Sequence, residues 1–170
     1  MNLQDFIRDI PDFPKPGILF KDITPLLGNP EASRLATLSL VDLTKGLKID
    51  KVIGIESRGF FFSTLIADKL NAGFVPVRKP NKLPFDKLSQ EFHLEYGTDR
   101  LEIHKDAIDK GDRVLVHDDV LATGGTAEAA CKLVEELGGE VVQCNFLIEL
   151  SFLKGRDLLS KYNIGSLINY

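Results

Sequence analysis

Short runs of consecutive apolar residues alternate along the chain with longer segments whose apolar residues recur every three or four positions. Continuous runs of this kind are typical of parallel strands that are covered on both faces. They lie at residues 51–55, 114–116 and 141–150. The helically spaced segments lie at 60–70, 127–137 and 153–162. Strands that alternate with helices predict an α/β fold with a doubly wound, mainly parallel sheet, which a terminal strand at 166–170 would extend.

The N-terminal third has a different pattern. Apolar residues at i, i+3, i+4 and i+7 from Leu3 predict a short helix that ends at Pro11. Residues 12–27 contain three prolines and a glycine, which predicts an ordered extended segment rather than a helix. Asn29, followed by Pro and Glu, is a helix N-cap and predicts a helix that continues to a stop at Gly46.

The middle of the chain predicts an edge strand followed by a loop and a hairpin. Pro76 lies inside the strand pattern of residues 74–79, and proline is confined to edge or irregular strands. Residues 80–90 carry prolines and lysines without periodicity, which predicts a basic, mobile loop. Alternation at 91–96 and again at 101–104 predicts a hairpin that turns at residues 97–99.

Composition limits the classes of protein to which the chain can belong. With 170 residues and 44% hydrophobic content, we expect one domain spanning residues 1–170. A formal net charge of -4 argues against nonspecific attraction to nucleic acid or to an anionic membrane. Cys131 and Cys144 lack metal-site spacing, so we expect reduced, buried thiols. The chain shows neither a secretory signal pattern nor a long apolar run, which predicts a cytoplasmic protein.

The stretch VLVHDDVLATGGTA, residues 114–127, carries the clearest chemistry. A buried strand leads into a turn and then a helix, and open α/β sheets bind ligands at the carboxyl ends of their strands. Glycines let successive backbone N–H groups approach one anion, while two threonine hydroxyls and the helix N-terminus add donors. The natural ligand is a phosphate. The predicted phosphate cradle consists of Ala122, Thr123, Gly124, Gly125 and Thr126.

Asp118 and Asp119 precede the cradle, and carboxylates accept hydrogen bonds from sugar hydroxyls but repel phosphates. The combination predicts a phosphorylated sugar, with the acids on a ribose diol and the cradle on the 5-phosphate. A P-loop requires Lys after its last Gly, where Thr126 stands, and the dinucleotide-binding glycine spacing is absent. An ordinary strand-to-helix turn is the alternative to the whole interpretation.

This stretch resembles the phosphoribosyl-pyrophosphate signature of type I phosphoribosyltransferases, and its LATGGT ending resembles their adenine branch. The resemblance implies a small N-terminal hood over the base, at about residues 1–30, and a flexible lid hairpin. A second strand-to-helix junction, IGIESRGF, places Arg58 and backbone amides at a helix N-terminus and so predicts a second anion site. IGIESRGF resembles the pyrophosphate loop of the family, which implies a cis peptide between Glu56 and Ser57.

The resemblance also implies roles for individual residues. Phe20 would stack on adenine, the Leu19 backbone would read the edge of the base, and Val120 would face it. Within HLEYGTDRLEIH, Glu95 would move a proton on the purine, and Tyr96 would belong to the closing lid. Glu95 and Arg58 are the expected catalytic residues. The predicted pyrophosphate-binding residues are Glu56, Ser57, Arg58, Arg78, Lys79 and Lys82.

The implied activity is purine salvage: adenine and phosphoribosyl pyrophosphate give AMP and pyrophosphate. Mg²⁺ would be bound mainly through phosphoribosyl pyrophosphate, with no direct protein ligand expected, and a homodimer is implied. One alternative is a phosphoribosyltransferase for another base, either a 6-oxopurine or orotate. The other is a non-catalytic regulator that binds the same donor, which should bring a DNA-binding module and a basic surface. The negative net charge argues against such a regulator.

Three residues depart from the usual family pattern. Ser63 stands where Gly is usual, and we expect it to affect helix packing rather than chemistry. His117 and Val120 stand where aliphatic Val and Leu are more frequent. A metal site formed by His117, Asp118 and Asp119 is disfavoured, because adjacent strand residues point to opposite faces. We expect His117 to be packed or hydrogen-bonded instead.

Overall fold

The computed structural model describes residues 1–94 and 97–170. The chain divides into two compact units, Met1–Ser39 and Leu40–Tyr170. We call them the N-terminal unit and the main unit and describe each by itself. Whether they form the single domain expected from composition stays a prediction.

The N-terminal unit contains a two-stranded antiparallel sheet. A short 3-10 helix, Leu3–Phe6, precedes β1 (Arg8–Pro11), which pairs with β2 (Leu19–Asp22). The predicted helix up to Pro11 is therefore wrong beyond Phe6, because pairing with β2 provides backbone partners that a short isolated helix lacks.

Two helices follow β2. Helix α1 (Thr24–Gly28) lies inside the segment that we expected to be extended throughout, and its proline occupies the first turn, where a missing N–H is tolerated. Helix α2 (Pro30–Asp42) begins as predicted, since the Asn29 side chain accepts hydrogen bonds from the backbone N–H groups of Glu31 (3.0 Å) and Ala32 (2.9 Å). It ends at Asp42, before the predicted stop at Gly46.

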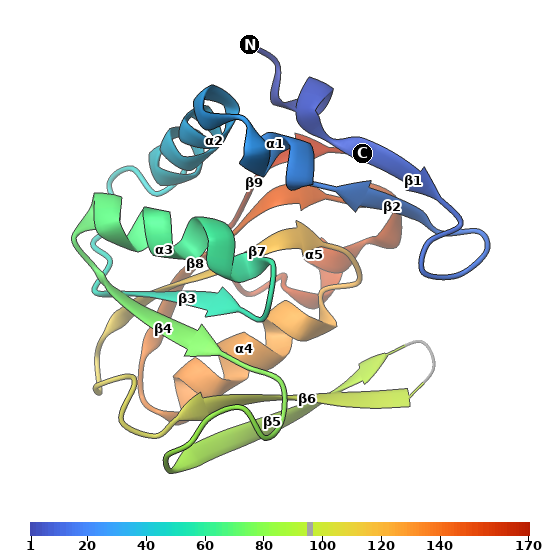
Figure 1. Ribbon diagram of the computed structural model, residues 1–170. Coiled ribbons are helices and arrows are strands. Elements are labelled where there is room, and N and C mark those ends of the chain that lie inside the picture. The colour runs from blue at the N-terminus through green and yellow to red at the C-terminus, as the bar shows by residue number, and fades with distance from the viewer. Residues whose placement is uncertain (95–96) are drawn as a thin grey trace. The chain divides into compact units, whose positions relative to one another are not determined.

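The main unit is built on a parallel sheet, which in the described residues has five strands in the order β4-β3-β7-β8-β9. The strands are β3 (Lys51–Ile55), β4 (Gly73–Val77), β7 (Arg113–Leu121), β8 (Glu140–Glu149) and β9 (Ile164–Asn169). Helices α3 (Gly59–Leu70) and α4 (Gly125–Glu136) cover opposite faces of the sheet (Figure 1). The predicted doubly wound α/β fold is confirmed, and β4 lies at the edge of the sheet, as Pro76 indicated.

The central position of β7 follows from its sequence. Val114, Leu115 and Val116 are fully buried, as expected for a strand with helices on both faces. Helix α3 connects β3 to β4, which lies on the side of β3 away from β7. Helix α4 connects β7 to β8, which lies on the side of β7 away from β3. The order of the strands therefore reverses between β3 and β7. Ligands of open α/β sheets bind at such a switch point.

A hairpin of β5 (Lys87–Leu94) and β6 (Gly97–His104) forms a separate antiparallel sheet. The predicted hairpin is confirmed, but β5 begins earlier than expected, and residues 97–99 belong to β6 rather than to a turn. The backbones of Arg78 and Glu102 exchange hydrogen bonds of 2.9 and 2.8 Å, which joins the segment after β4 to the hairpin. The mobility expected for the loop at 80–90 stays a prediction.

The segment between β8 and β9 differs most from expectation. Instead of one helix over 153–162, it forms a 3-10 helix (Ser151–Leu153) and a one-turn α5 (Gly155–Leu158). Arg156 of α5 pairs with Glu149 at the end of β8, at 2.7 Å, which turns the segment back toward the sheet.

The remaining expectations concern packing. Cys131 and Cys144 are free and buried, as predicted. Ser63 is fully buried against β3, where a side chain on Gly54 would overlap its hydroxyl, so its departure from the family pattern concerns helix packing, as expected. Within residues 1–94 and 97–170, no helix has both the length and the apolar character needed to cross a membrane.

Candidate active site

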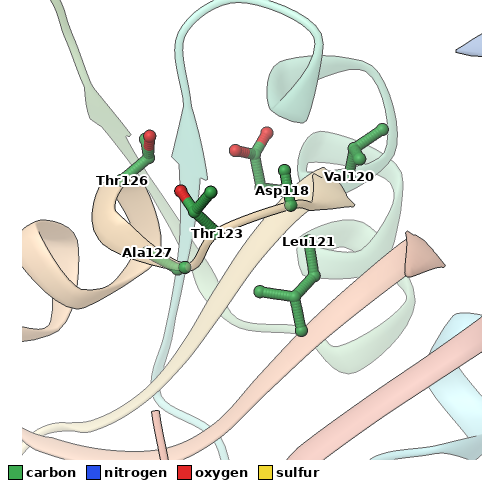
Figure 2. Close-up of a pocket in the computed structure, with 8 residues that line it drawn as sticks. Asp118, Val120, Leu121, Thr123, Thr126 and Ala127 are labelled. Atoms are coloured by element: carbon green, nitrogen blue, oxygen red, sulfur yellow. The ribbon is translucent and has the colours of Figure 1, made fainter. Parts of the chain in front are cut away.

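The predicted phosphate cradle forms a pocket between β7 and α4. The residues that line it are Asp118, Val120, Leu121, Ala122, Thr123, Gly124, Thr126 and Ala127 (Figure 2). Gly124 precedes α4 with φ +90°, a conformation that L side chains rarely adopt, so the turn requires glycine there. The side-chain oxygen atoms of Asp118, Thr123 and Thr126 point to the same side of the turn (Figure 2). Gly125 instead faces the hairpin, where an added Cβ would lie 3.4 Å from the His93 carbonyl oxygen.

The second predicted anion site lies directly beside the first. A Cβ on Gly59, at the start of α3, would lie 2.8 Å from Asp118 Oδ1, so this glycine lets the two strand-to-helix junctions touch. Arg58 Nη2 lies 2.7 Å from Asp119 Oδ2. The cis peptide between Glu56 and Ser57 is present, as the resemblance implied. The structure therefore brings Arg58, the acid pair and the cradle into one site.

The two acids share an environment that disfavours charge. Burial, together with the neighbouring charge of Asp119, raises the pKa of Asp118 well above its ordinary value. Burial also raises the pKa of Asp119, while the Arg58 guanidinium acts in the opposite direction. Asp119 is therefore the more readily ionised of the two carboxyl groups. Hydroxyl donors of a bound sugar would replace the solvation that both groups lack.

The Glu56 carboxylate forms ion pairs with basic side chains of the loop that follows β4. Its side chain is only 8% exposed and accepts hydrogen bonds from Arg78 Nε (3.2 Å), Arg78 Nη2 (3.3 Å) and the Lys79 backbone N–H (2.9 Å). Lys82 Nζ lies 2.6 Å from the same carboxylate. Burial alone would raise the pKa of Glu56, but the hydrogen bonds from Lys82, Lys79 and Arg78 together lower it. The carboxylate is thus an ionised partner of two predicted pyrophosphate-binding cations.

Lys79 has a different partner from its neighbours. Its ammonium group pairs with Asp99 of β6 and lies 5.4 Å from the centroid of the Phe92 ring. The side chain is therefore directed to the hairpin, whereas those of Arg78 and Lys82 are directed to Glu56.

The predicted base-binding residues are divided between the two units, and their role in binding a base stays a prediction. Val120 lines the pocket. Leu19 and Phe20 belong to β2 of the N-terminal unit, where Leu19 is 48% exposed and the ring of Phe20 packs edge-to-face on Phe13 at 5.1 Å. Glu95 and Tyr96 lie outside the described residues, so their predicted roles stay predictions.

Sequence reasoning missed Gly155 as a component of the site. An added Cβ on Gly124 would lie 2.7 Å from the Gly155 carbonyl oxygen, so α5 packs directly on the cradle. One signal was present in the sequence, since an isolated glycine lay inside the helix predicted at 153–162 and such a glycine often has a packing reason.

His117 is packed in the core, as predicted. Its Nδ1 lies 2.7 Å from Asn145 Oδ1, and Asn145 donates through Nδ2 to the Leu40 carbonyl at 3.3 Å. This network assigns the proton to Nδ1 of the ring. Burial lowers the pKa of His117 to about 4. Among the residues that the structure describes, no group of three or more His, Cys, Asp or Glu side chains is placed to hold a metal ion.

His117 should make the protein sensitive to acid. Its pKa is about 4 in the folded chain against about 6.5 in the unfolded chain, so the unfolded state binds the proton first. The contribution of the neutral His117 ring to the free energy of unfolding is complete above the pKa of the unfolded chain. It is lost as pH falls from about 6.5 to 4 and amounts to about 3 kcal/mol. Between pH 7.5 and 5, we expect the free energy of unfolding of His117→Val to fall by about 2 kcal/mol less than that of the wild type, as measured by urea unfolding. Exposed His93→Gln is the control, and a wild-type pH slope in His117→Val would refute the prediction.

Comparisons with known proteins find relatives that match the whole length of the chain. The phosphoribosyl transferase domain family matches residues 31–163. The adenine phosphoribosyltransferase of Flavobacterium johnsoniae is 64% identical over 170 residues, which cover all of both chains. A crystal structure of the adenine phosphoribosyltransferase of Thermoanaerobacter pseudethanolicus superposes with a TM-score of 0.97 at 53% identity, covering 99% of this chain and 100% of the other.

A third relative has been solved with a base analogue. The structure of the Giardia lamblia enzyme complexed with 9-deazaadenine has a TM-score of 0.94 and 39% identity, and the match covers 99% of this chain and 96% of that one. Sequence and fold therefore both relate this chain to adenine phosphoribosyltransferases. The chain belongs to the phosphoribosyltransferase family, in its adenine phosphoribosyltransferase branch.

Proposed function

We propose that this chain transfers the 5-phosphoribosyl group from phosphoribosyl pyrophosphate to adenine, giving AMP and pyrophosphate with inversion at the anomeric carbon, as part of purine salvage. The observation that carries the proposal is the meeting of two anion sites across an acid pair, with Arg58 2.7 Å from Asp119. A donor with a phosphate at one end, a diol in the middle and a pyrophosphate at the other end matches this order of groups. The names of the full-length relatives support adenine as the acceptor.

The cradle would hold the 5-phosphate. Gly124 places the backbone of the turn at the start of α4, where N–H groups and the helix dipole favour an anion. The hydroxyls of Thr123 and Thr126 would add donors. Asp118 and Asp119 would accept hydrogen bonds from the ribose hydroxyls, which fixes the sugar between the two anion sites.

The leaving pyrophosphate would be bound by the second junction and by the basic loop. Bond breaking that runs ahead of bond making leaves positive charge on the sugar and negative charge on pyrophosphate, and fixed cations stabilise the latter. The cations are Arg58, Arg78, Lys79 and Lys82, with Ser57 beside them. We assign Glu56 the task of gathering Arg78 and Lys82, since a carboxylate would repel pyrophosphate but accepts hydrogen bonds from both side chains.

Mg²⁺ would be bound mainly through phosphoribosyl pyrophosphate. No group of three or more His, Cys, Asp or Glu side chains in the described residues is placed to hold a metal ion, so oxygen atoms of the donor and of water would supply the ligands. Bound there, the ion would offset negative charge on the leaving pyrophosphate. The protein's own contribution is to position the donor and to exclude water.

Adenine would be held by the hood and the pocket. Phe20 would stack on the ring, the Leu19 backbone would read its edge, and Val120 would cover it from the pocket. Glu95 would move a proton on the purine, and Tyr96 and the hairpin would close over the donor to exclude water from the reactive carbon. The Giardia lamblia relative, solved with 9-deazaadenine, supports a purine ligand of this kind. We further propose a cytoplasmic homodimer.

A panel of bases tests the proposal. With Mg²⁺ and phosphoribosyl pyrophosphate present, we expect pyrophosphate release and AMP formation with adenine and little release with hypoxanthine, guanine or orotate. Turnover with one of the other bases instead would identify a phosphoribosyltransferase of different specificity. Donor binding without release for any base would identify the non-catalytic regulator.

A further inference from the structure

The turn that forms the phosphate cradle packs against a segment from outside its own sequence stretch. Gly155, the first residue of α5, is buried against the turn that follows β7. A Cβ on Gly155 would overlap the Ala122 carbonyl oxygen and lie 2.9 Å from Leu121 Cδ1. Conversely, a Cβ added to Gly124 would lie only 2.7 Å from the Gly155 carbonyl oxygen. The two segments are thus in backbone-to-backbone contact, which no larger residue than glycine would allow.

Arg156 holds α5 in this place. Its guanidinium forms a bidentate pair with Glu149, with Nε at 2.7 Å from Oε1 and Nη2 at 2.8 Å from Oε2. Nη2 also donates to Ser166 Oγ of β9 at 3.2 Å, and Ser166 donates to Glu149 Oε2 at 2.6 Å. The Glu149 side chain is only 7% exposed, so this is a largely desolvated carboxylate with two fixed partners.

The pair is anchored close to the cradle. Glu149 is the register partner of Leu121 where β8 lies beside β7, and the Leu150 backbone N–H donates to the Leu121 carbonyl at 2.9 Å. The ends of β8 and β9 therefore fix Arg156, Arg156 fixes α5, and Gly155 limits where the turn at Ala122 and Gly124 can lie. In Figure 1, α5 lies next to the carboxyl end of β7.

We propose that Gly155 and Arg156 are positioning residues of the 5-phosphate cradle: through backbone contact they hold Ala122 and Gly124 in the shape that binds phosphate. The inference rests on the proposed function, in which this cradle binds the 5-phosphate of the donor. Neither residue lines the pocket of the cradle. Their effect should therefore fall on ligands that carry a 5-phosphate and spare pyrophosphate, which binds at the Arg58 junction.

Separate titrations with ribose 5-phosphate and with pyrophosphate test the proposal on the full chain. We expect Gly155→Ala to weaken ribose 5-phosphate binding at least about 10-fold, and the apparent KM for the donor to rise accordingly, while pyrophosphate affinity stays within about 2-fold of wild type. Gly165→Ala in β9 is the matched control, because its Cβ would meet only the movable side chain of Leu43 at 3.1 Å. It should leave both affinities unchanged.

If Gly155→Ala does not fold, a second pair of variants tests whether α5 positions the cradle. Arg156→Gln breaks the pair with Glu149 and should weaken ribose 5-phosphate selectively, and Arg156→Lys should recover part of the loss because it keeps the charge. Wild-type ribose 5-phosphate affinity in these variants would overturn the inference, as would an equal loss for both ligands. Failure of the proposed function would show differently, as absence of adenine-dependent turnover in the wild-type chain.

Discussion

Replacing Gly124 with Val should raise the KM for phosphoribosyl pyrophosphate on the order of 100-fold or more. The reason is that a β-branched residue is strained at positive φ and would also clash with its neighbour. Gly124 has φ +90°, and its added Cβ would lie 2.7 Å from the Gly155 carbonyl oxygen. The turn can relieve the clash only by moving away from α5. That movement turns its N–H groups away from the position of the 5-phosphate. Steady-state kinetics with varied donor at saturating adenine measures the effect.

A matched variant separates strain from the loss of the cradle. Gly111 also has φ +90°, but an added Cβ there meets nothing within 4 Å, and the residue lies in the turn before β7. Gly111→Val should lose stability in a similar way while its KM for the donor stays near that of wild type. A Gly124→Val chain whose donor KM is unchanged would remove the assignment of the 5-phosphate site.

Glu95→Gln should lower kcat for AMP formation by about 100 to 10,000-fold, the range typical of a lost general acid or base. The expectation comes from the resemblance of HLEYGTDRLEIH to the adenine branch, since Glu95 lies outside the described residues. Glutamine keeps the size and polarity of the side chain but cannot exchange a proton. KM for adenine and for the donor should therefore change much less than kcat.

The hairpin offers its own control. Glu91 lies in β5 and is exposed, so Glu91→Gln should turn over at the wild-type rate. The pH profile of kcat/KM supplies an independent measure, because the limb that reports Glu95 should vanish in Glu95→Gln and persist in Glu91→Gln. Wild-type turnover by Glu95→Gln would show that another group handles the proton.

Hydrophobic periodicity predicted the central sheet because these strands and helices are locally consistent. Residues 114–116 are apolar on both faces and lie in the central strand, and Pro76 correctly marked an edge. Errors arose where a tertiary partner outweighed local spacing. The residues after Phe6 pair with β2 instead of continuing a helix, and α5 is one turn long because Arg156 is drawn to Glu149.

The pocket between β7 and α4 could be anticipated from the sequence because its residues are contiguous, so that glycine, threonine and helix signals fall in one stretch. The relations between distant residues were not visible. Arg58 meets Asp119 only because β3 and β7 are neighbours, and strand order is a property of the whole sheet. Gly155 reaches Ala122 for a similar reason, through the return of the chain after β8. Such contacts depend on topology, which single-sequence patterns do not encode.

The Glu56 carboxylate gives the free protein an internal counter-ion. Arg78 and Lys82 both contact it, so the loop proposed to bind pyrophosphate is not a cluster of unpaired positive charges. A bound pyrophosphate would exchange with this carboxylate for the same donors rather than neutralise unpaired cations. Part of the binding energy is then spent on breaking existing pairs, which limits how tightly the product is retained. When pyrophosphate departs, Glu56 can take back both side chains, so the same contact that orders the loop also favours release and the next turnover.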